Sequence, residues 1–144
     1  MAKTTRQYVF EGMELLPEAL IPFVEKRLEN SLKGHWQHEV VDRISGLKAN
    51  SKGDVAWDQA SLLKTMMFLW KEAFATVLGH PERSYVSELL DVRNKLSHNE
   101  TFTYDDAERA LDSMRRLMEA ISAGETSAEI SKMRETILRT KYAE

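Results

Sequence analysis

Residues 58–78, DQASLLKTMMFLWKEAFATVL, determine how the rest of the chain must pack. Their apolar side chains cover almost the whole circumference of a helix, and Asp58 can cap its first turn. A helix that is apolar on nearly every side is buried among other helices. The segment therefore predicts the central helix of an all-α domain. Its apolar residues are Leu62, Leu63, Met66, Met67, Leu69, Trp70, Phe74, Val77 and Leu78.

The sequence before this segment also has helical periodicity. Pro17 and Pro22 interrupt an otherwise regular apolar stripe, which predicts two helices there rather than one. No stretch alternates apolar and polar residues between turn signals, so no strand is expected. The expected segments are helices over residues 8–16, 23–32 and 35–44 and a polar loop over residues 47–55.

The sequence after the central segment predicts three more helical features. His80 is expected at the C-terminal end of the central helix, next to the breaking Pro81. Ser84 is expected to open a helix that ends at or near His98. A further helix, capped by Thr103 and acidic in its first turn, should run to Gly124.

The last segment differs from the others because its apolar stripe is narrow and basic residues surround it. A capping box over residues 126–129, Thr-Ser-Ala-Glu, predicts its start. The chain is thus expected to be an all-α bundle of about five to six helices over residues 1–124. Residues 125–144 are expected to form a C-terminal helix that packs outside, links to another domain, or contacts a partner.

Composition limits the functional classes. The 144 residues suit one domain, and 42% hydrophobic with 30% charged residues is ordinary for a globular chain. The absence of cysteine excludes disulfides, thiolate metal sites and cysteine nucleophiles, which suits a cytoplasmic protein. No run of about twenty apolar residues occurs, so no membrane span is expected. With a net charge of −3, any contact with nucleic acid must be local.

Neither a nucleotide cofactor nor a metal is expected. The six glycines are scattered singly, so none forms a phosphate-binding loop. His35 and His38, followed by Glu39 and Asp42, bring two imidazoles together but lack the spacing and the third ligand of a zinc protease. A polar helix face beside a buried Trp36 is the better interpretation.

Residues 93–98, RNKLSH, place an arginine, an asparagine and a histidine at a predicted helix end. At about 100° per residue, Asn94 and His98 lie on one face with Arg93 beside it, so all three could enter one cleft. Imidazole and guanidinium groups suit phosphodiester cleavage, as proton carrier and as bidentate phosphate ligand. The alternative is that Arg93 and Lys95 complement the helix dipole while Asn94 and His98 are merely solvated.

The stretch from Tyr85 to Ile121, YVSELLDVRNKLSHNETFTYDDAERALDSMRRLMEAI, resembles the HEPN superfamily of small α-helical domains. The signature of that superfamily is an arginine, a polar residue, three further residues and a histidine at a helix end, and RNKLSH matches it throughout. The likeness is closest to the branch found at one end of a nuclear mRNA-surveillance endonuclease and at the N-termini of large prokaryotic ATPases and phage-defence proteins. It is specific over the second half of the chain and general over the first.

The resemblance implies a HEPN-like helical bundle that acts as a metal-independent endoribonuclease or as an RNA-binding module. Carried over by position, His98 is the general base or acid, Arg93 neutralises the phosphorane, and Asn94 orients the phosphate or the histidine. Members of the family dimerise so that two motifs face each other. A symmetric homodimer with isologous contact between the ends of the motif helices is therefore expected.

A second hypothesis comes from a different functional class. The chain could be a non-catalytic dimerisation or docking domain of a larger prokaryotic ATPase or defence protein, with residues 125–144 as the connection. A cytoplasmic setting in phage defence or stress is expected for both hypotheses. The expected partners are a second copy of the chain, RNA and a larger ATPase or other defence protein, and no membrane.

Overall fold

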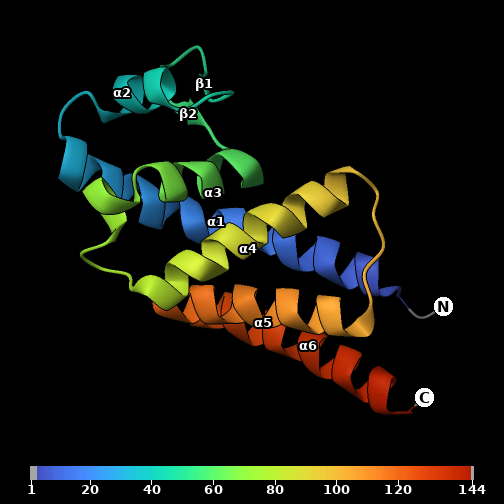
Figure 1. The fold of residues 1–144 in the computed structure, drawn as a ribbon. Coiled ribbons are helices and arrows are strands. Elements are labelled where there is room, and N and C mark those ends of the chain that lie inside the picture. The colour runs from blue at the N-terminus through green and yellow to red at the C-terminus, as the bar shows by residue number, and fades with distance from the viewer. Residues whose placement is uncertain (1–2, 144) are drawn as a thin grey trace.

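The computed structural model describes residues 3–143. Residues 1 and 2 of the predicted segment 1–124 and residue 144 of the predicted segment 125–144 lie outside the described residues. The described residues are mostly helical, which confirms the all-α class. The elements shown in Figure 1 are α1(Thr5–Leu32), α2(Trp36–Arg43), β1(Lys48–Ala49), β2(Val55–Ala56), α3(Gln59–Phe68), η1(Trp70–Phe74), α4(His80–Ser97), α5(Tyr104–Ala120) and α6(Gly124–Ala143).

The first helix, α1, is continuous through Pro17 and Pro22, so the prediction of two helices is wrong. A proline inside a helix removes one backbone hydrogen bond and costs about 3 kcal/mol. The buried stripe of α1 continues at spacings of three and four on both sides of the prolines, and its packing outweighs that cost. The stripe consists of Val9, Met13, Leu16, Leu20, Val24 and Leu28.

The central segment is buried as expected but is not one helix. Asp58 caps α3 by accepting a hydrogen bond from the Ser61 N–H at 2.7 Å, which confirms the predicted cap. α3 ends at Phe68, and the π-helical turn η1 follows. Val77, which was expected in the core, lies beyond η1 in the turn before α4 and is 48% exposed.

The starts of two later helices also differ from the predictions. α4 begins at His80 instead of Ser84, because the Gly79 N–H donates to the Glu82 side chain at 2.8 Å and Pro81 is tolerated in a first turn. His80 therefore opens α4 rather than ending the central helix. α6 begins at Gly124, so residues 126–129 lie inside it and do not cap it.

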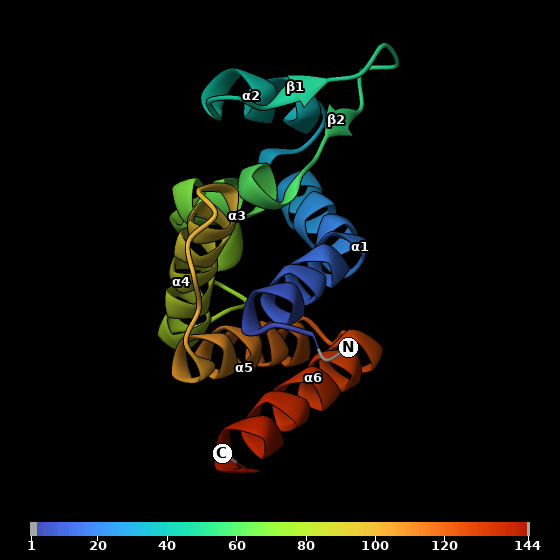
Figure 2. The same cartoon turned by 90° about the vertical axis from the view of Figure 1, so that its right-hand side faces the viewer.

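Residues 47–55, predicted as a polar loop, contain the two-residue strand β1 and the first residue of β2, and the two strands pair antiparallel. The turn between them is closed by the Asn50 side chain, which accepts hydrogen bonds from the Lys52 and Asp54 N–H groups. This hairpin and α2 lie at one end of the molecule, and α6 lies at the other (Figures 1 and 2).

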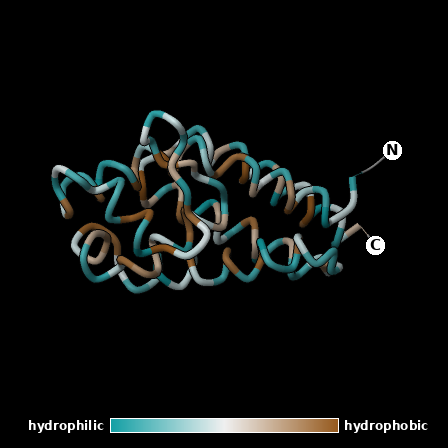
Figure 3. The backbone as a smooth tube through the Cα atoms, turned by 90° about the horizontal axis from the view of Figure 1, so that it is seen from above, coloured by the Kyte–Doolittle hydropathy of each residue, from teal (hydrophilic) through white to brown (hydrophobic). Residues whose placement is uncertain are grey.

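The helices pack around α5, which contacts α1, α4 and α6, while α3 packs against α1 and α4. Hydrophobic and hydrophilic stretches alternate along the helices, as Figure 3 shows from above. α6 buries only a thin stripe that includes Ile130 and Ile137. The end of α4 that carries residues 93–98 projects from this packed body (Figure 1). No helix among residues 3–143 is both long and apolar enough to cross a bilayer.

Candidate functional site

The predicted motif lies at the C-terminal end of α4, where the backbone stops the helix sharply. The Glu100 N–H donates to the Lys95 carbonyl at 3.0 Å, and the Asn99 N–H donates to the Leu96 carbonyl at 3.2 Å. Asn99 has a φ of 57°, in the left-handed region that asparagine adopts more readily than most residues. Together these features form a Schellman motif, with His98 at the C-cap.

Residues of the first turn of α1 and of the loop to α5 hold this end of α4 in place. Arg6 Nη2 donates to the Leu96 carbonyl at 2.6 Å, and the Thr5 hydroxyl donates to the Phe102 carbonyl at 2.7 Å. The Lys95 ammonium lies 4.7 Å from the centroid of the buried Phe102 ring. The backbone under the motif is therefore fixed by long-range contacts.

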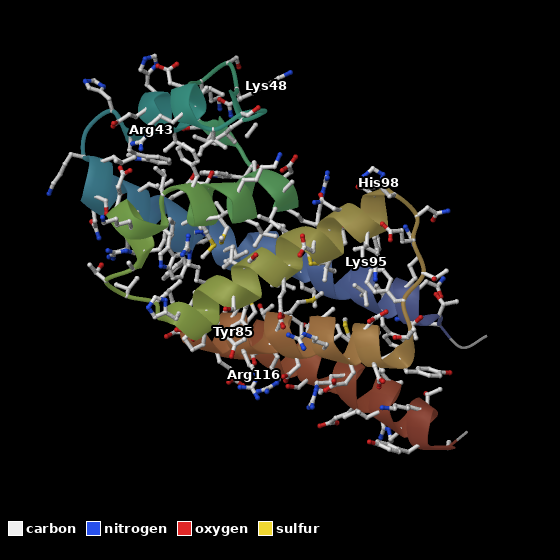
Figure 4. All side chains as sticks on the ribbon, viewed as in Figure 1. Arg43, Lys48, Tyr85, Lys95, His98 and Arg116 are labelled. Carbon is white, nitrogen blue, oxygen red and sulfur yellow. The ribbon has the colours of Figure 1, made fainter. Side chains whose placement is uncertain are left out.

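His98 is exposed at this fixed end. Figure 4 shows its side chain outside the bundle, at the tip of α4. Asn94 is also exposed and lies one helical turn earlier on the same face. Neither side chain hydrogen-bonds to any residue between 3 and 143, so both are available to a ligand.

Arg93 is half-buried and turned toward the start of α3. Partial burial raises the pKa of the Asp58 carboxyl, but hydrogen bonds from the Ser61 backbone and hydroxyl outweigh it. The Arg93 charge lowers that pKa further, and the net result is a pKa below the ordinary value. The Arg93 guanidinium makes no hydrogen bond or close ion pair with the described residues. On an ideal helix Arg93 and His98 point about 140° apart.

Two of the acidic residues near the motif, Asp91 and Asp106, lie on the α5 side of α4. The backbone N–H and the hydroxyl of Thr103 interact with the Asp106 carboxylate at the cap of α5 and lower its pKa, with a smaller effect from the Lys95 charge. Asp106 and Asp91 line a cavity of about 170 Å³ between α4 and α5. The Lys95 ammonium lies 3.8 Å from Asp106. These carboxylates are therefore on a different side of α4 from Arg93.

Each chain supplies one imidazole at this position. His35 and His38 lie on or next to α2, and His80 is at the opposite end of α4. His38 lies 3.7 Å from Asp42, and both are exposed. Within residues 3–143 no group of three His, Asp or Glu side chains could hold a metal ion.

Sequence reasoning located the motif but missed the residues that fix it. Arg6 lies 90 positions before Leu96, so no local pattern connects them. A basic residue at the start of an amphipathic helix is a weak indication of such a contact, but surface arginines are common at such positions. The Schellman motif was easier to predict from the sequence, because an asparagine follows the last apolar residues of α4.

Comparison with known proteins gives one match. The model of the Swt1-like HEPN family matches residues 11–122, which include the whole of α4 and α5. No curated protein and no solved structure matches the chain. Arg6 and Thr5 lie just before the matched region, and the whole of α6 lies after it.

Proposed function

Because this chain belongs to the Swt1-like HEPN family, we propose that it is a metal-independent endoribonuclease in which Arg93, Asn94 and His98 of two chains act on one RNA strand. The observation that best supports this proposal concerns the side chain and the backbone at the C-terminal end of α4. The His98 imidazole is exposed and has no hydrogen-bond partner in the described chain, although the backbone that carries it is held firmly. A polar side chain presented in this way contributes little to folding and is free to meet a ligand.

The proposed reaction requires proton transfer at two oxygens. One imidazole removes the proton of a ribose 2′-hydroxyl, and that oxygen attacks the adjacent phosphorus. The bond to the 5′-oxygen breaks, and a second, protonated imidazole gives its proton to that leaving oxygen. The products are a 2′,3′-cyclic phosphate and a free 5′-hydroxyl. The guanidinium of Arg93 stabilises the negative charge of the phosphorane, and Asn94 orients the phosphate.

A single chain does not supply both proton carriers, because His98 is the one histidine at this end of α4. A two-fold axis near the tip would bring the second imidazole from a second copy. It would also place Arg93 of one chain near His98 of the other. The two side chains could then act on the same phosphate, although they point in different directions on a single helix. The proposed site is therefore complete only in a homodimer.

The test compares His98→Ala with His80→Ala, which removes the same side chain from the other, exposed end of α4. We expect the wild type and His80→Ala to cleave single-stranded RNA in EDTA and to leave 2′,3′-cyclic phosphate ends. His98→Ala should lose cleavage by at least about a hundredfold, the usual contribution of a general acid or base. Its melting temperature should stay close to that of the wild type, because the side chain has no partner to lose.

Cleavage that needs magnesium, or that persists in His98→Ala, would reject this proposal. A change in self-association without any cleavage by the wild type would favour the non-catalytic docking domain, with α6 as the connection to a larger ATPase. A cytoplasmic role in phage defence is the setting we infer for either outcome.

A further inference from the structure

An exposed aromatic residue lies at the C-terminal end of α3, beside Arg43 at the end of α2. Phe68 is 62% exposed, whereas Ile44 is buried and Met67 and Leu90 are partly buried. Together with Ile44, Met67 and Leu90 it lines an open groove of about 420 Å³ between α2, α3 and α4. An exposed aromatic ring in an apolar groove is an interaction site more often than an accident of packing.

Two cations border this groove. The Arg43 guanidinium lies 5.9 Å from the centroid of the Phe68 ring. Two hydrogen bonds of 2.7 and 3.1 Å to the Glu72 carboxylate hold it there, and they also balance its charge. Lys64, on the rim, is exposed and forms neither a hydrogen bond nor an ion pair with the rest of the described chain. The groove thus combines an exposed aromatic ring with one cation that has no hydrogen bond or close ion pair in the described chain.

The groove shares one residue, Leu90, with the side of α4 that carries Asn94 and His98. Leu90, Asn94 and His98 follow one another at intervals of four residues, so they lie along one side of the helix. Leu90 forms part of the groove wall, about two helical turns or roughly 12 Å before His98. Lys64 and Arg93 are both close enough to Asp58 to lower its pKa, which places these two cations on the same side of the molecule.

We propose that this groove seats an unpaired nucleobase of the RNA strand, stacked on Phe68, with a neighbouring phosphate at Lys64. The inference rests on the proposed function, and it adds a binding subsite for the same RNA strand about two helical turns of α4 away from His98. Single-stranded RNA is generally held by aromatic stacking together with Lys or Arg contacts to the backbone. A purely apolar protein segment would make no use of Lys64, and the charge on the rim therefore favours a nucleic acid.

The test measures binding of a short single-stranded 2′-O-methyl RNA, which lacks the nucleophilic hydroxyl and cannot be cleaved. 2-Aminopurine, whose fluorescence falls on stacking, is placed at one position at a time. Phe68→Leu should weaken binding roughly tenfold and abolish the fluorescence change at one position, since leucine keeps the apolar contact but loses the stack. Phe68→Tyr should retain both. Phe10→Leu is the matched control, because Phe10 is also an exposed phenylalanine, 48% exposed on α1.

The inference is overturned if Phe68→Leu binds the oligonucleotide as the wild type does. It is also overturned if Phe68→Leu changes self-association in solution but not RNA affinity, since the groove would then be a contact between copies. Parallel cleavage assays on unmodified RNA separate this result from the nuclease proposal. Phe68-dependent binding without any cleavage would reject the nuclease alone, and cleavage with an unchanged KM in Phe68→Leu would reject the subsite alone.

Discussion

At Gly12, α1 approaches α5 closely. A Cβ atom at this position would lie 2.7 Å from Met114 Sδ and 2.9 Å from Leu111 Cδ2, closer than such atoms approach. Both side chains are fully buried and have little room to move. A glycine in mid-helix is unfavourable in itself, so its presence here follows from the packing of the two helices.

We therefore expect Gly12→Ala to lower the free energy of unfolding by about 1 kcal/mol. The overpacking costs about 1–3 kcal/mol, and the better helix propensity of alanine offsets at most about 1 kcal/mol of it. Urea denaturation measures the difference. The control is Gly34→Ala, where an added Cβ meets nothing and stability should hardly change. A Gly12→Ala variant as stable as Gly34→Ala would show that α1 and α5 can separate without loss.

A helix cap connects the chemistry of one residue to the stability of a whole helix. Asp58 caps the start of α3 and also lies between the groove and the motif. Loss of the cap in Asp58→Ala should cost about 1 kcal/mol at neutral pH. Because the folded-state pKa of Asp58 lies below the ordinary 3.8, this contribution is present above that value and is lost as pH falls through the folded-state pKa. The stability difference between the wild type and Asp58→Ala should therefore become smaller in strong acid, where only the neutral cap is left.

Urea unfolding of both proteins across a pH series checks this prediction. A stability difference that stays constant down to a pH well below 3.8 would mean that the ionised carboxylate is not what stabilises α3. Asp58→Asn is the useful third variant, because asparagine also caps helices but carries no charge. It should be as stable as the wild type in acid and should show no such pH dependence from this position.

Two of the four helix starts predicted from capping signals were confirmed, whereas those at Ser84 and at residues 126–129 were wrong. Asp58 and Thr103 cap their helices as predicted, because each cap depends on residues within one turn. The continuous path of α1 through Pro17 and Pro22 could not be predicted from local signals, since packing against distant helices decides it. The break between α3 and η1 could not be predicted either, because no glycine or proline marks it in the sequence.

The candidate site likewise has one part that could be predicted from the sequence and one part that could not. RNKLSH is contiguous, so its position at a helix end was visible in the sequence. The Arg6 contact to Leu96 and the groove around Phe68 join residues from different helices, and they appear only when the chain is folded. The family resemblance supplied roles for three residues, whereas the fold supplied the surface that could hold their substrate.

At the scale of the whole molecule, charge is distributed unevenly between two sides. Ion pairs on the α5 and α6 side neutralise several acidic residues, among them Glu108 with Arg134 and Asp112 with Arg115. The side formed by α3 and α4 instead carries Arg93 and Lys64 without close ion-pair partners in the described chain. A protein of net charge −3 can therefore still present a local site for a phosphate.

This arrangement leads to a prediction about assembly. If each active site needs His98 from both chains, then mixing the wild type with His98→Ala should reduce activity more than dilution does. After equal amounts exchange subunits at random, about one quarter of the dimers contain two intact chains, so activity should fall to about one quarter of its starting value per total protein. A site that is complete within one chain would instead retain about one half.

The measurement is the initial rate of RNA cleavage across a series of mixing ratios at fixed total protein, after incubation long enough for subunit exchange. Activity should follow the square of the wild-type fraction. The control replaces His98→Ala with His80→Ala, which leaves both tips intact and should keep the rate constant at every ratio. A straight line for His98→Ala, with exchange verified independently by mass-tagged chains, would exclude a shared site. The diverging directions of Arg93 and His98 around one helix would then have to be bridged within a single chain.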